Sequence, residues 1–232
     1  MSRRPKHEVW ITTQNHWDYC RPALESVLRH TPEHVRIVVV DDGSDSEARV
    51  KLARFSSRTN IPVLWHREPK GLTAGWREAV DFSDPRGHVT ILNNDILVAS
   101  WWHDRMLRGL QQHPDVGMVG VLSNNPGHRS GQNVRLHAPG FSKDEVRDPA
   151  QLERINATLE PGFVYAEHGV NGFAFLLRRE CIKEVGNFDP KNRSLGNEDE
   201  YQERMRAAGW KSGFVTDVHI WHAKRVTLPG RA

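Results

Sequence analysis

Hydrophobic and polar positions alternate along the first half of the chain with two different spacings. Short apolar runs predict strands, and they lie at about residues 7–14, 35–40, 61–67, 89–98 and 116–123. Apolar residues at helical spacing separate them and predict helices at about residues 20–30, 47–57, 73–82 and 101–112. A regular alternation of strands and helices favours an α/β fold with a largely parallel, doubly wound sheet and right-handed crossovers.

The second half of the chain is less regular. Residues 123–167 are rich in Gly, Pro, Asn and Ser and contain one amphipathic helix candidate near residues 149–159. A long irregular segment inside a compact domain is usually a functional loop or a flexible lid. The pattern then resumes with a strand, a short helix, a longer helix and a last strand, expected at about residues 170–179, 180–185, 197–209 and 213–223.

Composition narrows the class of protein. A chain of 232 residues with 38% hydrophobic and 26% charged residues is typical of one compact globular domain, expected over residues 1–232. No apolar stretch is long enough to cross a bilayer, and the first residues lack the apolar core of a signal peptide, so we expect a cytoplasmic protein without a membrane span. Cys20 and Cys181 are expected to be reduced. A net charge of +3 suits an anionic ligand but is too small to establish a nucleic-acid partner.

Polar side chains end three of the predicted parallel strands. "QNH" ends the first strand, "DDGS" the second and "NND" the fourth, and ligands of open α/β sheets bind at this edge. We therefore expect Asp41, Asp42 and Asp95 to lie close together, where a divalent cation or hydrogen-bond donors of a ligand would offset their repulsion. "DDGS" alone is equally explained as a turn and helix cap. "NND" follows its strand without Gly or Pro, and its oxygen atoms suit Mg²⁺ or Mn²⁺.

Two further groups of residues carry candidate chemistry. Glu198, Asp199 and Glu200 follow Asn197 at a predicted helix start, where acidic residues also simply complement the helix dipole. His219 and His222 lie an odd number of residues apart on the last strand, so only one of them faces the cleft. No GxGxxG, GxxxxGK[ST] or GxSxG motif is present, which argues against a dinucleotide-binding oxidoreductase, a P-loop nucleotidase and an α/β-hydrolase.

Eight segments, in this order and spacing, resemble the family 2 glycosyltransferases of the GT-A fold. The resemblance covers about residues 8–227, and the segments read "ALESVLRH" after "TTQN", "VVVDDGSDSEA", "KGLTAGWREAV", "LNNDILV", "GMVGVLSNN", "VNGFAFLLRRECIKEVGNFDP", "NEDEYQERMRAAGW" and "HIWHAKRVT". The resemblance implies a metal-assisted, inverting transfer of one sugar from a UDP-, dTDP- or GDP-linked donor to an acceptor hydroxyl. It also implies a nucleotide-sugar-binding half over residues 8–122 and an acceptor-binding and catalytic half over residues 123–232.

The resemblance also implies the roles of individual residues. Asp199 would be the general base, and Asp95 and His222 would hold Mn²⁺ or Mg²⁺, with His222 preferred over His219 because Thr227 follows it in the family's pattern. Lys224 and Arg225 would neutralise the diphosphate. The complete set of expected substrate contacts is Thr13, Asn15, Asp41, Asp42, Gly71, Asn93, Asn94, Asn171, Gly172, Glu198, Lys224 and Arg225.

The chain departs from the family's pattern at some positions. Asn93 stands where many relatives carry the first aspartate of the metal triplet, and Trp76 and Arg77 stand where relatives often show asparagine. The absence of a QxxRW motif favours transfer of a single sugar. Two alternatives are a non-catalytic sugar-nucleotide or glycan-binding module on the same fold, and a nucleotidyltransferase. The acceptor is a cell-surface glycan, a protein or a modified nucleic acid.

Overall fold

The computed structural model describes residues 7–126, 130–138, 148–193 and 196–223. The strands within these residues are β1 (Glu8–Thr13), β2 (Arg36–Asp41), β3 (Val63–Trp65), β4 (Val89–Asn93), β5 (Ile96–Leu97), β6 (Val116–Ser123), β7 (Phe163–Tyr165), β8 (Ala174–Leu177) and β9 (Lys211–His222). The helices are α1 (Trp17–His30), α2 (Ser46–Thr59), α3 (Leu72–Phe82), α4 (Trp102–Gln112), α5 (Pro149–Thr158), α6 (Arg179–Val185) and α7 (Asn197–Ala207), with short 3₁₀ helices η1 (Ser130–Gln132) and η2 (Val134–Leu136).

The strands form one mixed sheet in the order β3-β2-β1-β4-β8-β6-β9-β5, and β7 pairs with β9. β1, β2, β3 and β4 are parallel to one another, as the alternating pattern predicts. β8 is inserted between β4 and β6 and is antiparallel to both, and β5 and β7 are antiparallel to β9. Both predicted halves of the chain therefore contribute neighbouring strands to the same sheet.

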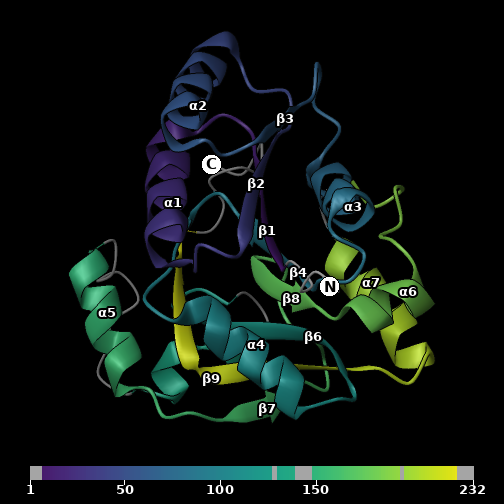
Figure 1. The fold of residues 1–232 in the computed structure, drawn as a ribbon. Helices are drawn as coiled ribbons and strands as arrows, with labels where there is room; N and C mark the ends of the chain where they lie inside the picture. The colour runs from purple at the N-terminus through teal and green to yellow at the C-terminus, as the bar shows by residue number, and fades with distance from the viewer. Residues whose placement is uncertain (1–6, 127–129, 139–147, 194–195, 224–232) are drawn as a thin grey trace, which may run out of the picture.

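Helices cover the two faces of this sheet, as Figure 1 shows. Alternate strand residues enter two apolar layers because successive side chains point to opposite faces. In β2, Val39 belongs to the apolar cluster that contains residues of α1, α2 and α4, whereas Val38 and Val40 belong to the cluster that contains residues of α3, α6 and α7. Burial of both faces explains why the strands of the first half are nearly continuous apolar runs.

The predicted α/β class and every predicted helix occur, with ends that agree to within one helical turn. Several expectations differ from the structure. The strand predicted over residues 61–67 is limited to β3, and the strand predicted over residues 89–98 is divided into β4 and β5. The strand predicted over residues 170–179 is limited to β8, and residues 123–167, expected to be irregular apart from one helix, contain β7, η1, η2 and α5. β7 was missed because three residues are too few to establish a period.

Cys20 and Cys181 are buried free thiols, and burial raises the pKa of each to about 12. Such thiols are unreactive, which agrees with the expectation that they have no chemical role. Among the described residues, no helix has both the length and the apolar character that crossing a membrane requires.

Candidate functional site at the carboxyl ends of the strands

The polar ends of β1, β2 and β4 meet at one edge of the sheet. The register pairs Thr13 with Asp41 and Thr12 with Asn93, which aligns the three strand ends. Nδ2 of Asn94 donates a hydrogen bond to Oγ1 of Thr13 at 2.9 Å, and the backbone N–H of Asp42 donates to the Thr13 carbonyl oxygen at 2.8 Å. The ends of the three strands therefore lie next to one another, and the expected proximity of Asp95 to Asp41 and Asp42 stays a prediction.

Asp95 and His222 lie side by side, although 127 positions separate them in sequence. Nε2 of His222 is 3.4 Å from Oδ1 of Asp95, and both side chains are buried. β5 brings them together, because Ile96 pairs with His222 and the Asp95 carbonyl oxygen accepts a hydrogen bond from the Ala223 N–H at 3.0 Å. The two predicted metal ligands thus form a pair.

Two residues that sequence reasoning missed hold His222 in place. The His222 N–H donates to Oδ1 of Asn124 at 2.8 Å, and Nδ2 of Asn124 donates to the His222 carbonyl oxygen at 3.2 Å. The ring of Phe173 stacks on the imidazole with centroids 4.8 Å apart and an interplanar angle of 16°. Asn124 follows β6 as Asn94 follows β4, so the strand-end pattern carried a signal for it.

The pair offers a suitable donor set for Mn²⁺ or Mg²⁺. Oδ1 of Asp95 and Oδ1 of Asn93 are buried without a hydrogen-bond partner among the described residues, which leaves both oxygens available as ligands. Carboxylate, amide oxygen and imidazole all occur as ligands of these cations. No group of three His, Cys, Asp or Glu side chains in the described part of the chain is arranged to hold a metal. A cation here would therefore take its remaining ligands from a diphosphate and water, as Mg²⁺ commonly does.

His219 does not reach this site. It is fully buried on the other face of β9, and burial lowers its pKa to about 3. Its backbone N–H donates to Oδ1 of Asn156 at 2.8 Å, which ties β9 to α5. Lys224, Arg225 and Thr227 lie outside the described residues.

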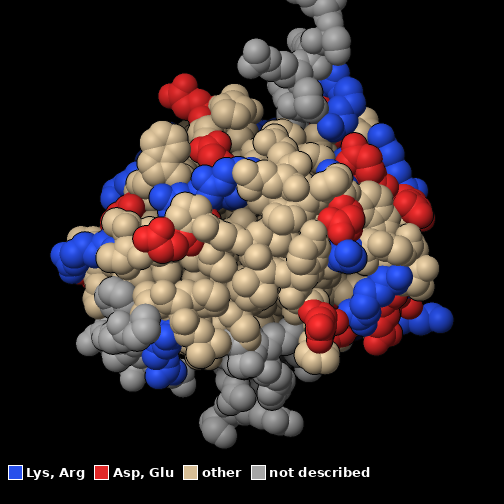
Figure 2. Space-filling model, turned by 90° about the horizontal axis from the view of Figure 1, so that it is seen from below, with Lys and Arg blue, Asp and Glu red and all other residues tan. Residues whose placement is uncertain are grey.

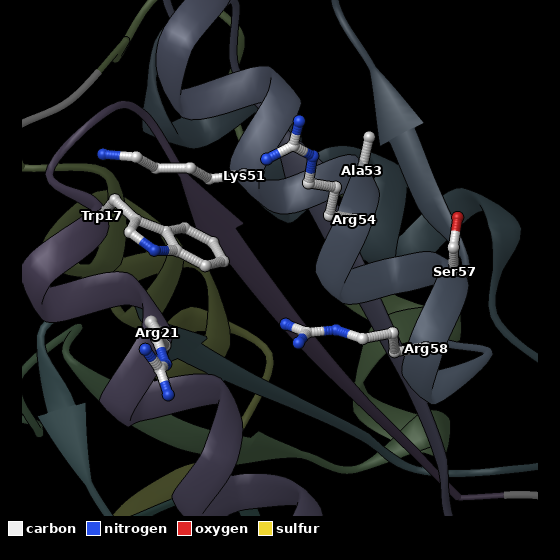
Figure 3. A pocket seen from close by; sticks show the side chains of 7 residues that line it. All are labelled: Trp17, Arg21, Lys51, Ala53, Arg54, Ser57 and Arg58. Atoms are coloured by element: carbon white, nitrogen blue, oxygen red, sulfur yellow. The ribbon is translucent and has the colours of Figure 1, made fainter.

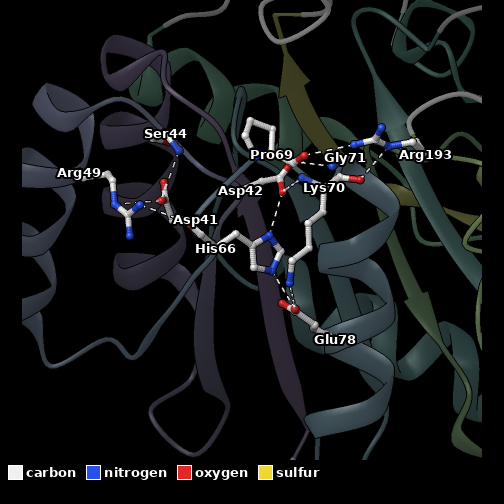
Figure 4. Close-up of polar contacts among 10 residues, drawn as sticks. All are labelled: Asp41, Asp42, Ser44, Arg49, His66, Pro69, Lys70, Gly71, Glu78 and Arg193. Carbon is white, nitrogen blue, oxygen red and sulfur yellow. Dashed lines mark hydrogen bonds and ion pairs between the residues drawn. The ribbon is translucent and has the colours of Figure 1, made fainter.

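Both carboxylate oxygens of Asp42 accept hydrogen bonds from other residues of the chain (Figure 4). Its Oδ1 accepts a hydrogen bond from the Lys70 N–H at 2.7 Å, and its Oδ2 accepts one from the Gly71 N–H at 2.9 Å. Nδ1 of His66 lies 2.8 Å from the same Oδ1, and Nε2 of His66 lies 2.7 Å from Oε1 of Glu78. Asp42 therefore fixes the loop between β3 and α3, and His66, which sequence reasoning missed, links that loop to α3.

Asp41 is in a different situation. It is fully buried, its Oδ2 accepts a hydrogen bond from the Ser44 N–H at 3.4 Å, and Nε of Arg49 lies 3.6 Å from that oxygen. Its Oδ1 has no hydrogen-bond partner among the described residues. Burial raises the pKa of Asp41, while Ser44 and Arg49 oppose this shift. Of the two adjacent aspartates, Asp41 keeps an acceptor oxygen for another donor.

Asn15 and Gly71 shape the same edge. Oδ1 of Asn15 accepts a hydrogen bond from the Asp45 N–H at 2.8 Å, and its own N–H donates to Oγ of Ser44 at 2.8 Å, so its polar groups hold the "DDGS" loop. Gly71 begins α3 with φ of 97°, and a Cβ there would lie 2.6 Å from the Arg193 carbonyl oxygen. Only glycine fits this position without strain.

The acidic first turn of α7 is connected to the Asp95–His222 pair through Gly172 and Phe173. A Cβ on Gly172 would lie 2.8 Å from the Trp76 ring and 3.0 Å from the carboxyl carbon of Glu198, so Glu198 approaches this backbone closely. Phe173 stacks on His222, and its carbonyl oxygen accepts a hydrogen bond from the Asn93 N–H at 2.9 Å. Trp76 itself is a core residue.

Asp199 is exposed on the first turn of α7. Nδ2 of the buried Asn197 donates to Oγ1 of Thr73 at 3.0 Å, which fixes the start of α7 against α3. The helix dipole favours a charged carboxylate at this position. Asp199 is thus presented to solvent from a rigid helix start.

Gln132, which sequence reasoning missed, holds Asn171 in place. Its Oε1 accepts hydrogen bonds from the Asn171 N–H at 2.9 Å and from Nδ2 of Asn171 at 3.0 Å. Its Nε2 donates to the Val121 carbonyl oxygen at 2.8 Å. A single buried glutamine in an irregular segment carries no sequence signal, because only the contact across to β6 distinguishes it from other polar loop residues.

Solved structures and curated sequences show which class of protein has this architecture. GalNAc-T7 with UDP, GalNAc and Mn²⁺ superimposes with a TM-score of 0.72 at 17% identity, over 96% of this chain and 44% of that chain. The mannosyltransferase PcManGT from Pyrobaculum calidifontis, in complex with GDP-Man and Mn²⁺, gives a TM-score of 0.66 at 18% identity, over 97% of this chain and 59% of that one. The chain thus has the glycosyltransferase GT-A fold predicted from its sequence and spans about half the length of these two solved chains.

The family follows from the sequence comparison. The chain belongs to glycosyl transferase family 2, whose sequence model matches residues 8–186. It is also 23% identical over 229 residues to the N-acetylglucosaminyl-diphospho-decaprenol L-rhamnosyltransferase of Mycobacterium tuberculosis, over 87% of this chain and 70% of the relative. The resemblance recognised from the eight sequence segments is confirmed, and the chain is a glycosyltransferase.

Proposed function

We propose that this glycosyltransferase moves one sugar from a nucleotide-diphosphate sugar to an acceptor hydroxyl with inversion at the anomeric carbon. The observation that carries the proposal is the buried Asp95–His222 pair at the carboxyl ends of the parallel strands, in which Oδ1 of Asp95 has no hydrogen-bond partner among the described residues. In open α/β sheets this edge is where ligands bind.

Residues 8–122 supply the donor side in this proposal. Asp41 is the better candidate for a nucleoside contact, because it keeps a buried acceptor oxygen whereas Asp42 is used by the loop at Gly71. Asn93, Asp95 and His222 would hold a divalent cation, Mn²⁺ or Mg²⁺, and such a cation would supply charge neutralisation for the diphosphate leaving group. Both solved neighbours contain Mn²⁺ together with UDP or GDP-Man, which supports this choice.

Residues 123–232 supply the acceptor side and the base. The acceptor oxygen attacks the anomeric carbon, the bond from that carbon to the diphosphate oxygen breaks, and its electron pair leaves with the diphosphate. We assign removal of the acceptor proton to Asp199, which α7 presents from a fixed helix start. Gly172, which Glu198 approaches closely, and Asn171, which Gln132 holds, would line the cleft in this proposal.

The acceptor we propose is a hydroxyl of a glycan, which includes a lipid-linked glycan. The support is the name of the mycobacterial relative, whose acceptor is an N-acetylglucosaminyl-diphospho-decaprenol. Protein and modified nucleic acid are the other acceptor classes, and each would need its own assay. Lys224 and Arg225 remain predicted diphosphate contacts.

The test is nucleotide release from a panel of UDP-, dTDP- and GDP-sugars, with Mn²⁺, with Mg²⁺ and with chelator. The chain is compared with Asp95→Ala and Asp199→Asn. We expect turnover of one donor, loss of turnover in chelator and in Asp95→Ala, and a fall in kcat of about a hundredfold or more in Asp199→Asn with little change in donor binding.

Two results would contradict the proposal. Donor binding without transfer to any acceptor class would favour the non-catalytic sugar-nucleotide module. Full activity of Asp199→Asn would show that another group removes the proton.

A further inference from the structure

A groove lies between α1 and α2, and none of its lining residues is among those assigned to the donor or the acceptor (Figure 3). Its volume is about 630 Å³, which is in the size range of small-ligand sites. None of the residues that line it is acidic: they are Trp17, Arg21, Lys51, Ala53, Arg54, Ser57 and Arg58. By contrast, Lys, Arg, Asp and Glu side chains are interspersed on the face seen in Figure 2.

The positive charge of the groove is only partly compensated. Arg21 pairs with Glu25 at 2.8 Å, and Lys51 pairs with Glu47 at 2.6 Å. Arg54 and Arg58 are exposed and have no hydrogen bond or ion pair among the described residues. They are four residues apart on α2, where like charges repel, so a bound anion would relieve an unfavourable arrangement.

Trp17 lies in this groove as a recessed ring. It is partly buried, and its indole meets Phe55 edge-on with centroids 6.0 Å apart. In Figure 3 the side chains of Arg54 and Arg58 extend from α2 toward the side of α1 that carries Trp17 and Arg21. Ala53 and Ser57 of α2 also line the groove.

We propose that this groove binds a nucleotide unit, with its phosphate on Arg54 and Arg58 and its base stacked against Trp17. The planar guanidinium groups suit phosphate oxygens, and an aromatic ring beside basic side chains is the usual arrangement for stacking a base. A membrane surface fits less well, because a tryptophan that anchors a protein in a bilayer protrudes rather than lying between two helices. The site is separate from the proposed donor site, with which it shares no residue.

The nucleotide unit has two sources, a free nucleotide or a single nucleic-acid strand, and two probes distinguish them. The intact chain is titrated with UMP and with a short fluorescein-labelled oligothymidylate at low salt. Inorganic polyphosphate and vesicles of phosphatidylserine and phosphatidylcholine serve as comparison probes. Arg54→Ala/Arg58→Ala removes the phosphate contacts, and Trp17→Leu removes the ring while keeping an apolar side chain over Phe55.

We expect UMP or the oligonucleotide to bind, and the double variant to weaken that binding by at least about tenfold. Trp17→Leu should weaken nucleotide binding but leave polyphosphate binding unchanged. The double variant Arg36→Ala/Arg86→Ala removes the same charge from exposed side chains at the opposite edge of the sheet and should bind like the unaltered chain. Asp95→Ala, which disables the proposed donor site, should also leave this binding unchanged.

The proposal is overturned if neither nucleotide probe binds, or if binding is unaffected in Arg54→Ala/Arg58→Ala, because the nucleotide then occupies the donor site alone. Equal affinity for polyphosphate and oligonucleotide, with no effect of Trp17→Leu, would show a general anion surface without base stacking. Binding to the vesicles alone would identify a membrane-docking surface instead.

Discussion

At the scale of single residues, adjacent side chains of the same type have different environments. Asp42 accepts hydrogen bonds from two backbone N–H groups of the loop at Lys70 and Gly71, whereas Asp41 keeps a buried oxygen without a partner among the described residues. Both aspartates match the family's "DDGS" motif equally well. The hydrogen-bond partners of the two carboxylates therefore distinguish Asp42, which stabilises the loop beside the site, from Asp41, which has an oxygen available to a ligand.

His66 is the first residue at which this distinction can be tested. Its ring connects Asp42 to Glu78, so His66→Ala should loosen the loop that ends at Gly71. We expect the donor KM to rise by about tenfold while kcat changes little, because the loop must be ordered again when the donor binds. His34→Ala, at an exposed histidine, serves as the control. A fall in kcat at unchanged KM would contradict a positioning role for His66.

Gly172 provides a second test at this scale. A Cβ would lie 2.8 Å from the buried Trp76 ring and 3.0 Å from Glu198, so Gly172→Ala should displace the first turn of α7. We expect kcat to fall by at least about tenfold and the free energy of unfolding to fall by about 1–3 kcal/mol. Gly131→Ala is the matched control, because a Cβ there meets Phe214 at an ordinary 3.5 Å. Normal kcat in Gly172→Ala would show that Glu198 and Asp199 tolerate this shift.

At the scale of elements, the two edges of the sheet differ in chemistry. The carboxyl ends of β1, β2 and β4 carry the candidate site, whereas their opposite ends carry histidines. His7 stacks on His88 with centroids 5.0 Å apart, and the buried His103 of α4 lies 6.5 Å from His7. The pKa of His103 is lowered to about 3, mainly by burial and further by the neighbouring His7, His34 and His88. The pKa of His88 is lowered to about 4, mainly by burial and then by His7.

These histidines predict sensitivity to acid. The unfolded chain takes up protons at the ordinary histidine pKa of about 6.5 while the folded chain does not, so the free energy of unfolding falls as the pH drops below that value. For His103 alone the loss between pH 7.5 and pH 5 should be about 2 kcal/mol, and His103→Leu should remove it. Urea unfolding of both proteins at the two pH values measures the difference. Parallel pH profiles for the two proteins would rule out His103 as the cause.

At the scale of the whole molecule, the chain is joined across its predicted halves. β8, from the second half, pairs with both β4 and β6 of the first half, and β9 pairs with β6. The base Asp199 and the ligand His222 proposed here belong to the second half, while Asp41 and Asp95 belong to the first. Completing the sheet therefore also assembles the candidate site.

Cooperative unfolding is the expected consequence. Near-ultraviolet and far-ultraviolet circular dichroism should report one coincident thermal transition for the intact chain. A fragment of residues 8–122 should not fold stably by itself, because it would leave the edges of β4 and β6 unpaired. Two separate transitions, or a folded fragment, would show that the donor and acceptor halves are independent domains.

The sequence by itself determined much of this protein. Its periodicities predict every helix and the parallel strands β1, β2 and β4, because burial of a sheet on both faces requires apolar runs separated by amphipathic helices. Its polar strand ends predict the edge of the sheet at which β1, β2 and β4 end together, and the order of its motifs predicts the family.

Only the tertiary structure decided the remaining features. The direction of β8 and its place between β4 and β6 do not follow from a pattern, since strand direction depends on pairing partners distant in sequence. The contact between Asp95 and His222 depends on β5 pairing with β9. Backbone N–H groups donate to both carboxylate oxygens of Asp42, whereas Oδ1 of Asp41 has no hydrogen-bond partner among the described residues. This difference depends on which donors the folded chain brings within reach of each oxygen.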